Sequence, residues 1–136
     1  MFCHSVAIAA RVKAEPLPPV PAIAGYIIDG DTFSAKVKLE NDASVSVRVR
    51  ILGIDAPELS GECDKETEWA HRSRNRLVEL LPENSEIYLV NVKDDKYLGR
   101  IDANVKLSDG RDVGEIMLRE NMAIPYSGGK RQPWCD

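Results

Sequence analysis

Two neighbouring segments, residues 32–39 and 45–51, alternate apolar and polar side chains without interruption. In the first, the apolar positions are Phe33, Ala35, Val37 and Leu39; in the second they are Val45, Val47, Val49 and Ile51. A period of two is typical of a strand with one buried and one solvated face. Asn41-Asp42 forms a turn signal between the two segments, and Asp29-Gly30-Asp31 separates the first from an apolar run at 23–28. The sequence therefore predicts a three-strand meander.

The period then changes to that of a helix. Residues 65–81 carry apolar side chains at helical spacing, and Pro82 ends the pattern. Residues 85–92 and 100–107 are typical of strands, and 113–120 of a second helix. The order β-β-β-α-β-β-α predicts a mainly β (α+β) domain, a five-stranded OB-fold barrel with two helices. Such a barrel closes its own edges and leaves one face and its loops for ligands.

The chain has 136 residues, enough for one domain, and proline is frequent from 14 to 21. We interpret residues 1–22 as a tail and proline-rich linker, and 23–136 as the folded domain. An apolar stretch at 6–10 precedes basic residues, the reverse of a secretory signal, which indicates a frayed tail or the remnant of a leader. No apolar run is long enough to span a membrane, so we expect no membrane association.

Three cysteines, at 3, 63 and 135, leave two interpretations open. Cys63 and Cys135 pair, with Cys3 left over, or all three are independent thiols. A periplasmic or secreted location is favoured if they pair, and a cytoplasmic one otherwise. Two histidines and scattered cysteines give no zinc-site spacing.

Charged side chains gather in three short segments near the expected strand ends: residues 29–32, 48–58 and 95–100. Taken singly, each is also typical of an ordinary turn or of a solvated strand end, where ion pairs contribute little. A phosphate clamp is the functional alternative for the third segment, because arginine presents a planar fork to phosphate oxygens.

Together and in this order, the three segments resemble the staphylococcal nuclease (thermonuclease) family. The resemblance is carried by Ile28-Asp29-Gly30-Asp31-Thr32, by Arg50 followed by Asp55-Ala56-Pro57-Glu58, and by Asp95-Lys96-Tyr97-Leu98-Gly99-Arg100. Three ordered motifs are far more specific than one short match. One departure is Leu98, an extra residue in a turn where the family usually has Tyr-Gly-Arg. This insertion could displace either Arg100 or Tyr97 from its usual position.

The resemblance implies a role for each matching residue. Asp31, Asp55 and the carbonyl of Ala56 would hold Ca²⁺, which prefers hard oxygen donors. Glu58 would be the general base that activates water, while Arg50 and Arg100 would bind the phosphate and stabilise its growing charge. The implied substrate contacts are Lys96, Tyr97 and Tyr126.

Two functions from different classes follow. The first is a calcium-dependent nuclease that hydrolyses phosphodiester bonds of DNA, RNA or both, working as a monomer without an obligate protein partner. The alternative is a non-catalytic module of the same fold that binds nucleic acid or a protein. Retention of the acidic ligands, the base and both arginines favours the enzyme, whereas a net charge of −4, without the basic excess of most nucleic-acid-binding proteins, favours the alternative.

Overall fold

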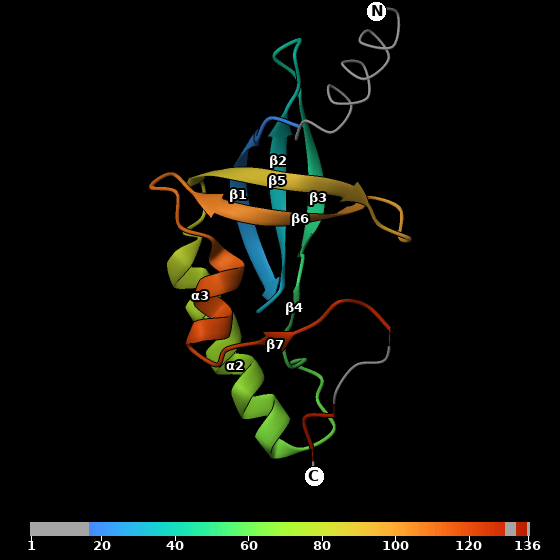
Figure 1. The fold of residues 1–136 in the computed structure, drawn as a ribbon, viewed down its shortest axis with the longest axis vertical. Helices are drawn as coiled ribbons and strands as arrows, with labels where there is room; N and C mark the ends of the chain where they lie inside the picture. Colours follow the sequence, from blue (N-terminus) through green and yellow to red (C-terminus); the bar gives the residue numbers. More distant parts are fainter. Residues whose placement is uncertain (1–16, 130–132, 136) are drawn as a thin grey trace, which may run out of the picture.

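The computed structural model describes residues 17–129 and 133–135, and its centre is a closed barrel of five strands (Figure 1). The strands are β1 (Val20–Asp29), β2 (Thr32–Lys38), β3 (Ser44–Ile51), β5 (Glu86–Asp94) and β6 (Arg100–Leu107). They close in the order β1-β2-β3-β6-β5, with β3 and β6 parallel and every other pair antiparallel. The predicted five-stranded OB-fold barrel is confirmed. Most of the predicted tail, residues 1–16, lies outside the described residues.

The alternating pattern places one face of each strand in the barrel interior. Phe33 and Ala35 of β2 pack inside with Val49 and Ile51 of β3, and all four side chains are buried. The inward face does not extend back to the start of β3, because Val47 is only partly buried and Val45 is exposed. The outward parity carries polar side chains, among them Ser34 and Arg48, which face each other across the β2–β3 pair.

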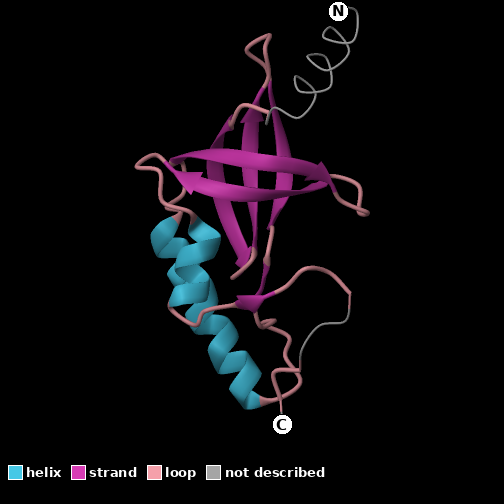
Figure 2. Cartoon of the chain, in the orientation of Figure 1, coloured by secondary structure: helices cyan, strands magenta, loops and turns pink. Residues whose placement is uncertain are grey.

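Two helices pack together beneath one end of the barrel (Figure 2). Helix α2 (Asp64–Leu80) lies against β1 and buries Ala70, Leu77 and Leu80 at helical spacing. Helix α3 (Val113–Arg119) contacts β6 and α2, and its first turn is capped by the Asp112 carboxylate, which accepts from the Glu115 amide at 3.0 Å. No helix in the described part of the chain is long and apolar enough to cross a membrane.

A small second sheet, which the sequence pattern did not predict, lies beside the barrel. Strands β4 (Ile54–Asp55) and β7 (Ile124–Pro125) pair antiparallel, so Asp55 lies opposite Ile124. Pro125 is therefore the last residue of a strand. Two-residue strands are too short to show a period, which is why only the structure reveals them.

The C-terminal segment is fastened to the start of α2. Cys63 and Cys135 form a disulfide, which is one of the two alternatives left open above. Close by, Trp134 is buried and its ring meets Trp69 of α2 edge to face at 4.6 Å between ring centroids. The Trp69 indole also donates to the Asn121 carbonyl at 2.8 Å. These contacts hold the segment after β7 near the loop that joins β4 to α2.

The turn between β1 and β2 packs tightly against α2. A β-carbon built on Gly30 would overlap the Ser73 hydroxyl and lie 3.0 Å from the Ala56 side chain. Glycine at this position therefore allows the turn to approach the helix closely. The approach matters because Asp31 follows directly and points toward the same loop.

We expect Gly30→Ala to destabilise the fold by about 1–3 kcal/mol, the usual range for overpacking a buried contact. Chemical denaturation of the single variant, of Ser73→Gly and of the double variant measures this. Because Ser73→Gly removes the obstructing side chain, the double variant should lose less free energy of unfolding than the sum of the single variants. Strictly additive losses would show that the Gly30–Ser73 contact is not the cause.

Candidate active site

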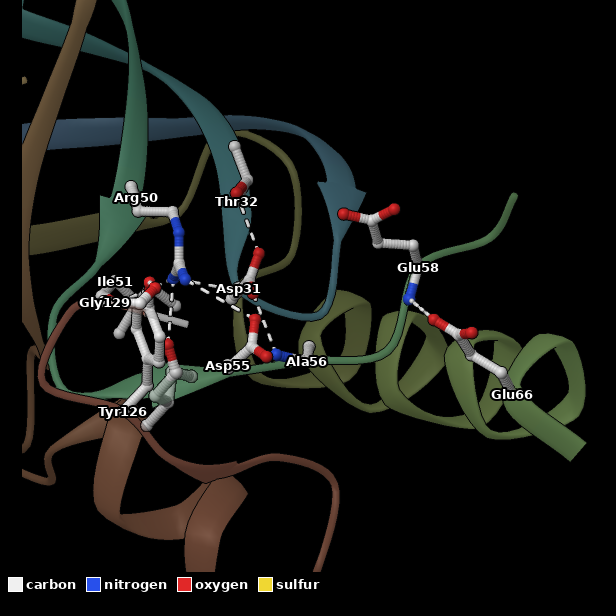
Figure 3. A network of polar contacts seen from close by, with 11 residues as sticks. Asp31, Thr32, Arg50, Ile51, Asp55, Ala56, Glu58, Glu66, Tyr126 and Gly129 are labelled. Carbon is white, nitrogen blue, oxygen red and sulfur yellow. Dashed lines mark hydrogen bonds and ion pairs between the residues drawn. The ribbon is translucent and has the colours of Figure 1, made fainter. Parts of the chain in front are cut away.

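Two buried carboxylates converge on one arginine at the edge of the barrel (Figure 3). Arg50 approaches Asp31 at 3.5 Å and Asp55 at 3.6 Å, through different guanidinium nitrogens. Asp55 is 1 % exposed and Asp31 is 6 % exposed. Buried charges are strongly unfavourable unless they are paired and hydrogen-bonded, so this arrangement needs both the ion pairs and the backbone contacts around it.

Backbone pairing brings the three residues together from separate parts of the chain. Arg50, the second-to-last residue of β3, lies directly opposite Thr32, and Asp31 immediately precedes Thr32. One oxygen of Asp31 accepts from the Thr32 hydroxyl at 2.9 Å, and the other accepts from the Ala56 amide at 2.8 Å. Asp55, just before Ala56, is held by its pairing with β7. The Asp31 carboxylate thus joins the β1–β2 turn to the loop after β4.

The guanidinium of Arg50 is fixed by more than its two carboxylate partners. One of its nitrogens donates to the carbonyls of Ile51 at 3.1 Å and Ile54 at 3.0 Å. The Tyr126 ring lies 5.8 Å from the guanidinium carbon, within the range of a cation–π contact. Tyr126 is itself positioned by its amide, which donates to the Gly53 carbonyl at 2.9 Å. Arg50 is therefore oriented before any ligand arrives.

Glu58 lies on the side of Asp31 away from Arg50 in the view of Figure 3, and its side chain is exposed. Its amide donates to the Glu66 carboxylate at 3.3 Å, and the Glu62 amide donates to the other oxygen of Glu66 at 3.1 Å. Glu66 belongs to the first turn of α2 and is buried. This carboxylate consequently holds the loop that carries Glu58 against the helix.

A turn between β5 and β6 supplies the second arginine. Arg100 pairs with Asp95 at 3.0 Å, and its guanidinium carbon lies 4.7 Å from the centroid of the Tyr97 ring. The Lys96 ammonium lies 5.2 Å from the centroid of the same ring. The extra residue, Leu98, is fully exposed, and the Arg100 amide donates to the Tyr97 carbonyl at 3.3 Å to close the turn. The insertion thus points into solvent, and Tyr97 and Arg100 remain in contact.

One cleft of about 730 Å³ unites these groups. All nine residues implied by the resemblance line it: Asp31, Arg50, Asp55, Ala56, Glu58, Lys96, Tyr97, Arg100 and Tyr126. Among the described residues, no group of three or more His, Cys, Asp or Glu side chains is placed to hold a metal ion. A cation held by Asp31 and Asp55 in this cleft would need carbonyl oxygen or water for its remaining positions.

The cleft also contains groups that the sequence argument missed. Thr32 and Asp102 line it, and Glu66 supports it from outside. Glu66 had a local signal, because a glutamate three residues after the N-cap position commonly reaches back to loop amides. Asp102 had none, since it is one polar residue on the outward parity of an ordinary strand. Its pairing with Arg50 across β3 and β6 appears only in the folded chain.

Asp102 and Asp95 form a coupled pair of carboxyl groups beside Arg100. Burial raises the pKa of Asp102, and the hydrogen bond and negative charge of Asp95 raise it further, to about 6, against the opposing effect of Arg100 and Arg50. Burial also raises the pKa of Asp95, but hydrogen bonds from Asp102, the Tyr97 amide and Arg100 outweigh it and leave this pKa at about 2. At mildly acidic pH the pair therefore shares one proton, held by Asp102.

This pair predicts a pH-dependent stability. Between the ordinary Asp pKa of 3.8 and a pKa of about 6, the folded protein keeps a proton on Asp102 that the unfolded chain has released. Folding stability from this group therefore falls as pH rises through that window. Asp102→Asn cannot ionise, so its free energy of unfolding relative to the parent should increase from pH 4 to pH 7, as measured by urea denaturation.

Asp109→Asn is the matched control, because Asp109 lies on an exposed turn and hydrogen bonds with Arg111 lower its pKa. Its difference from the parent should stay constant above pH 5. If the difference in free energy of unfolding between Asp102→Asn and the parent were also independent of pH, the raised pKa of Asp102 would be contradicted.

Comparison with known proteins agrees with this geometry. The family described as "Staphylococcal nuclease homologue" matches residues 48–133. A protein of Escherichia coli named "Uncharacterized endonuclease" is 28 % identical over 107 residues, covering 79 % of this chain. The chain spans 61 % of the length of that relative. The family match begins within β3 and includes β5, β6, both helices and the cleft residues from Arg50 to Tyr126, and the chain belongs to the staphylococcal nuclease homologue family.

Proposed function

We propose that this chain is a calcium-dependent nuclease that hydrolyses phosphodiester bonds of DNA, RNA or both. The observation that carries the proposal is the convergence of Asp31 and Asp55 on Arg50 in a cleft that also holds Glu58 and Arg100. Ion pairs by themselves are weak evidence of function, because many proteins contain them without using them in a site. Here the charged groups line an open cleft, as a site for an anionic ligand requires.

The donor set fits Ca²⁺. Two carboxylates face a single guanidinium, so Asp31, Asp55 and Arg50 together carry one unit of negative charge in a largely buried setting. We infer that Asp31, Asp55 and the Ala56 carbonyl would hold the cation, with water at its other positions. When bound, a calcium ion would supply positive charge to the phosphate and to the water that attacks it.

The two arginines are proposed to bind the phosphate. Arg50 is preorganised by two backbone carbonyls and the Tyr126 ring, and Arg100 by Asp95 and the Tyr97 ring. Charge on the phosphate oxygens grows in the transition state, and donors that are already oriented stabilise it without reorganisation. Lys96, Tyr97 and Tyr126 line the same cleft and are proposed to contact the rest of the nucleotide.

Glu58 is the proposed general base. It is an exposed carboxylate on the cleft wall, and the Glu66 contact fixes its backbone amide. Glu58 and Arg50 line the same cleft, so a phosphate bound at Arg50 would share that cleft with the base. Accepting a proton from a water would generate the nucleophile, while the leaving oxygen departs from the far side of phosphorus.

A non-catalytic binding module is the second candidate, favoured by the net charge of −4. Such a module would need the cleft to recognise a ligand but would not need a correctly placed base. Release of nucleotides from a nucleic acid separates the two candidates, because only the enzyme cleaves its ligand.

The disulfide between Cys63 and Cys135 also supports a proposal about location. Disulfides persist in oxidising compartments, so we propose that the protein works in the periplasm or outside the cell.

Release of acid-soluble nucleotides from heat-denatured DNA tests the function. We expect cleavage with Ca²⁺ and none with EGTA. Glu58→Gln should lower kcat by about a hundredfold or more, because general-base catalysis contributes about 10²–10⁴. Glu62→Gln, in the same loop but outside the cleft, should cleave like the parent. A folded parent protein that releases nothing under either condition would leave the binding module as the better candidate.

Arg100→Ala should lower kcat by about a hundred- to a thousandfold, the usual loss for one charge-stabilising group. Arg111→Ala is the control, because Arg111 pairs with Asp109 on a turn remote from the cleft lining. Full activity of the Arg100 variant, with unchanged thermal stability, would remove Arg100 from the proposed machinery.

A further inference from the structure

A second groove, of about 920 Å³, runs over the outer face of β1, β2 and β3. It adjoins the cleft, since Tyr97 and Arg100 line both. The floor of the groove is the outward parity of the strands, with Ser34 and Lys36 from β2 and Arg48 from β3. A ligand that leaves the cleft past Arg100 would therefore enter this groove.

Unpaired positive charge follows the groove away from the cleft. Arg48 is the next outward residue of β3 after Arg50, about 7 Å away at the usual strand rise. Its backbone pairs with Ser34 on one side and with Arg100 on the other. Both Arg48 and Lys36 are exposed, and neither makes an ion pair within the described part of the chain. Glu83 is the acidic side chain in this lining, so the groove is cationic on a chain whose net charge is −4.

Two exposed tyrosines lie in the same groove. Tyr26 and Tyr97 are each 56 % exposed, and both belong to the lining. Exposed aromatic side chains beside positive charge are the elements with which proteins bind single-stranded nucleic acid. Each base offers a face for stacking, and each phosphate offers a partner for an arginine or a lysine.

A β-bulge places Tyr26 in the groove. The register of β1 with β2 shifts between Ala24 and Ile27, and the Ser34 hydroxyl fills the gap. This hydroxyl accepts from the Tyr26 amide at 2.9 Å and donates to the Tyr26 carbonyl at 3.4 Å. Gly25 has no β-carbon, which would otherwise overlap the same hydroxyl. Bulges re-aim side chains and often lie next to functional sites.

We propose that this groove binds a single-stranded polynucleotide that extends from the cleavage site, with Tyr26 and Tyr97 stacking on bases and Arg48 and Lys36 contacting phosphates. The proposal rests on the proposed nuclease function and adds where the substrate lies beyond the scissile phosphate. An unpaired strand is specified because paired bases present no free face to these rings.

The test compares a long and a short substrate. We would measure cleavage of a sixteen-residue oligothymidylate and of bis(p-nitrophenyl) phosphate, which is too small to reach the groove. Tyr26→Ser should raise KM for the oligonucleotide about tenfold, as expected for loss of one stacking aromatic. Its kcat/KM for the small ester should equal that of the parent. Tyr88→Ser, on a strand outside the groove, should behave as the parent with both substrates.

A charge variant provides an independent measurement. Arg48→Ser combined with Lys36→Ser should weaken oligonucleotide binding and reduce the slope of log affinity against log salt by about 1.4, because each single-strand phosphate contact contributes about 0.7. Arg72→Ser, an exposed arginine on α2, is the control. Fluorescence anisotropy of a labelled oligothymidylate in EGTA measures this binding without cleavage.

The anisotropy measurement also keeps this inference separate from the function. The parent could bind the oligonucleotide without cleaving it, while the groove variants bind it more weakly. In that case the nuclease proposal fails, and the proposal that the groove binds a single strand is supported. Groove variants that bind and cleave the oligonucleotide as the parent does would overturn the inference. Equal weakening for a duplex of the same length would overturn the single-strand assignment.

Discussion

The ion pairs of Arg50 with Asp31 and Asp55 are the interaction on which the arrangement of the cleft depends. Two carboxylates this deeply buried repel each other, and Arg50 offsets that repulsion with an ion pair to each of them. The cluster also joins three separate pieces of backbone, because Asp31 lies in the β1–β2 turn, Arg50 near the end of β3 and Asp55 in β4. A single guanidinium thus orders a barrel edge and a loop together.

The contacts around that cluster hold its residues and the neighbouring loop in place. The Ala56 amide donates to Asp31, which brings the loop after β4 against the barrel, and β7 holds the other side of that loop. Further along, Glu66 fixes the Glu58 amide, and the Cys63–Cys135 disulfide lies at the start of the same helix. These contacts add polar and covalent restraints to a segment that also packs against the core through Ile54 and Ala56. The loop side of the site is consequently fastened by core packing, polar contacts and one covalent link.

The barrel was predicted from local patterns, whereas the residues that line the cleft were named from the resemblance to a known family. Alternation of apolar side chains specifies which face of β2 and β3 turns inward, and that choice also turns Arg50 outward. The three short motifs lie at strand ends, which a closed barrel brings to one edge. The structure therefore gathers Asp31, Asp55 and Arg100 into one cleft, although they come from distant parts of the chain.

What the sequence did not predict depends on long-range pairing. The β4–β7 sheet needs two-residue strands to meet, and no periodicity marks them. Asp102 becomes a cleft residue only because β6 pairs in a register that places it opposite Arg50. The bulge at Tyr26 forms only because the Ser34 hydroxyl bonds to the backbone of Tyr26. The inserted Leu98 left the position of Arg100 open, and the turn resolves it by exposing the leucine. Pairing registers and bulges are consequences of tertiary contact, which one-dimensional patterns do not contain.

The contrast between a net charge of −4 and a proposed polyanionic substrate disappears when charge is considered locally. At physiological ionic strength, exposed charges interact over only about 8 Å, so acidic residues on remote surfaces have little effect on a groove lined by Lys36 and Arg48. The cleft differs, because Asp31 and Asp55 outnumber Arg50 there. Its affinity for phosphate would therefore rise with a bound cation, and by linkage phosphate would raise its affinity for the cation. The groove has no such requirement, since its own side chains carry the positive charge.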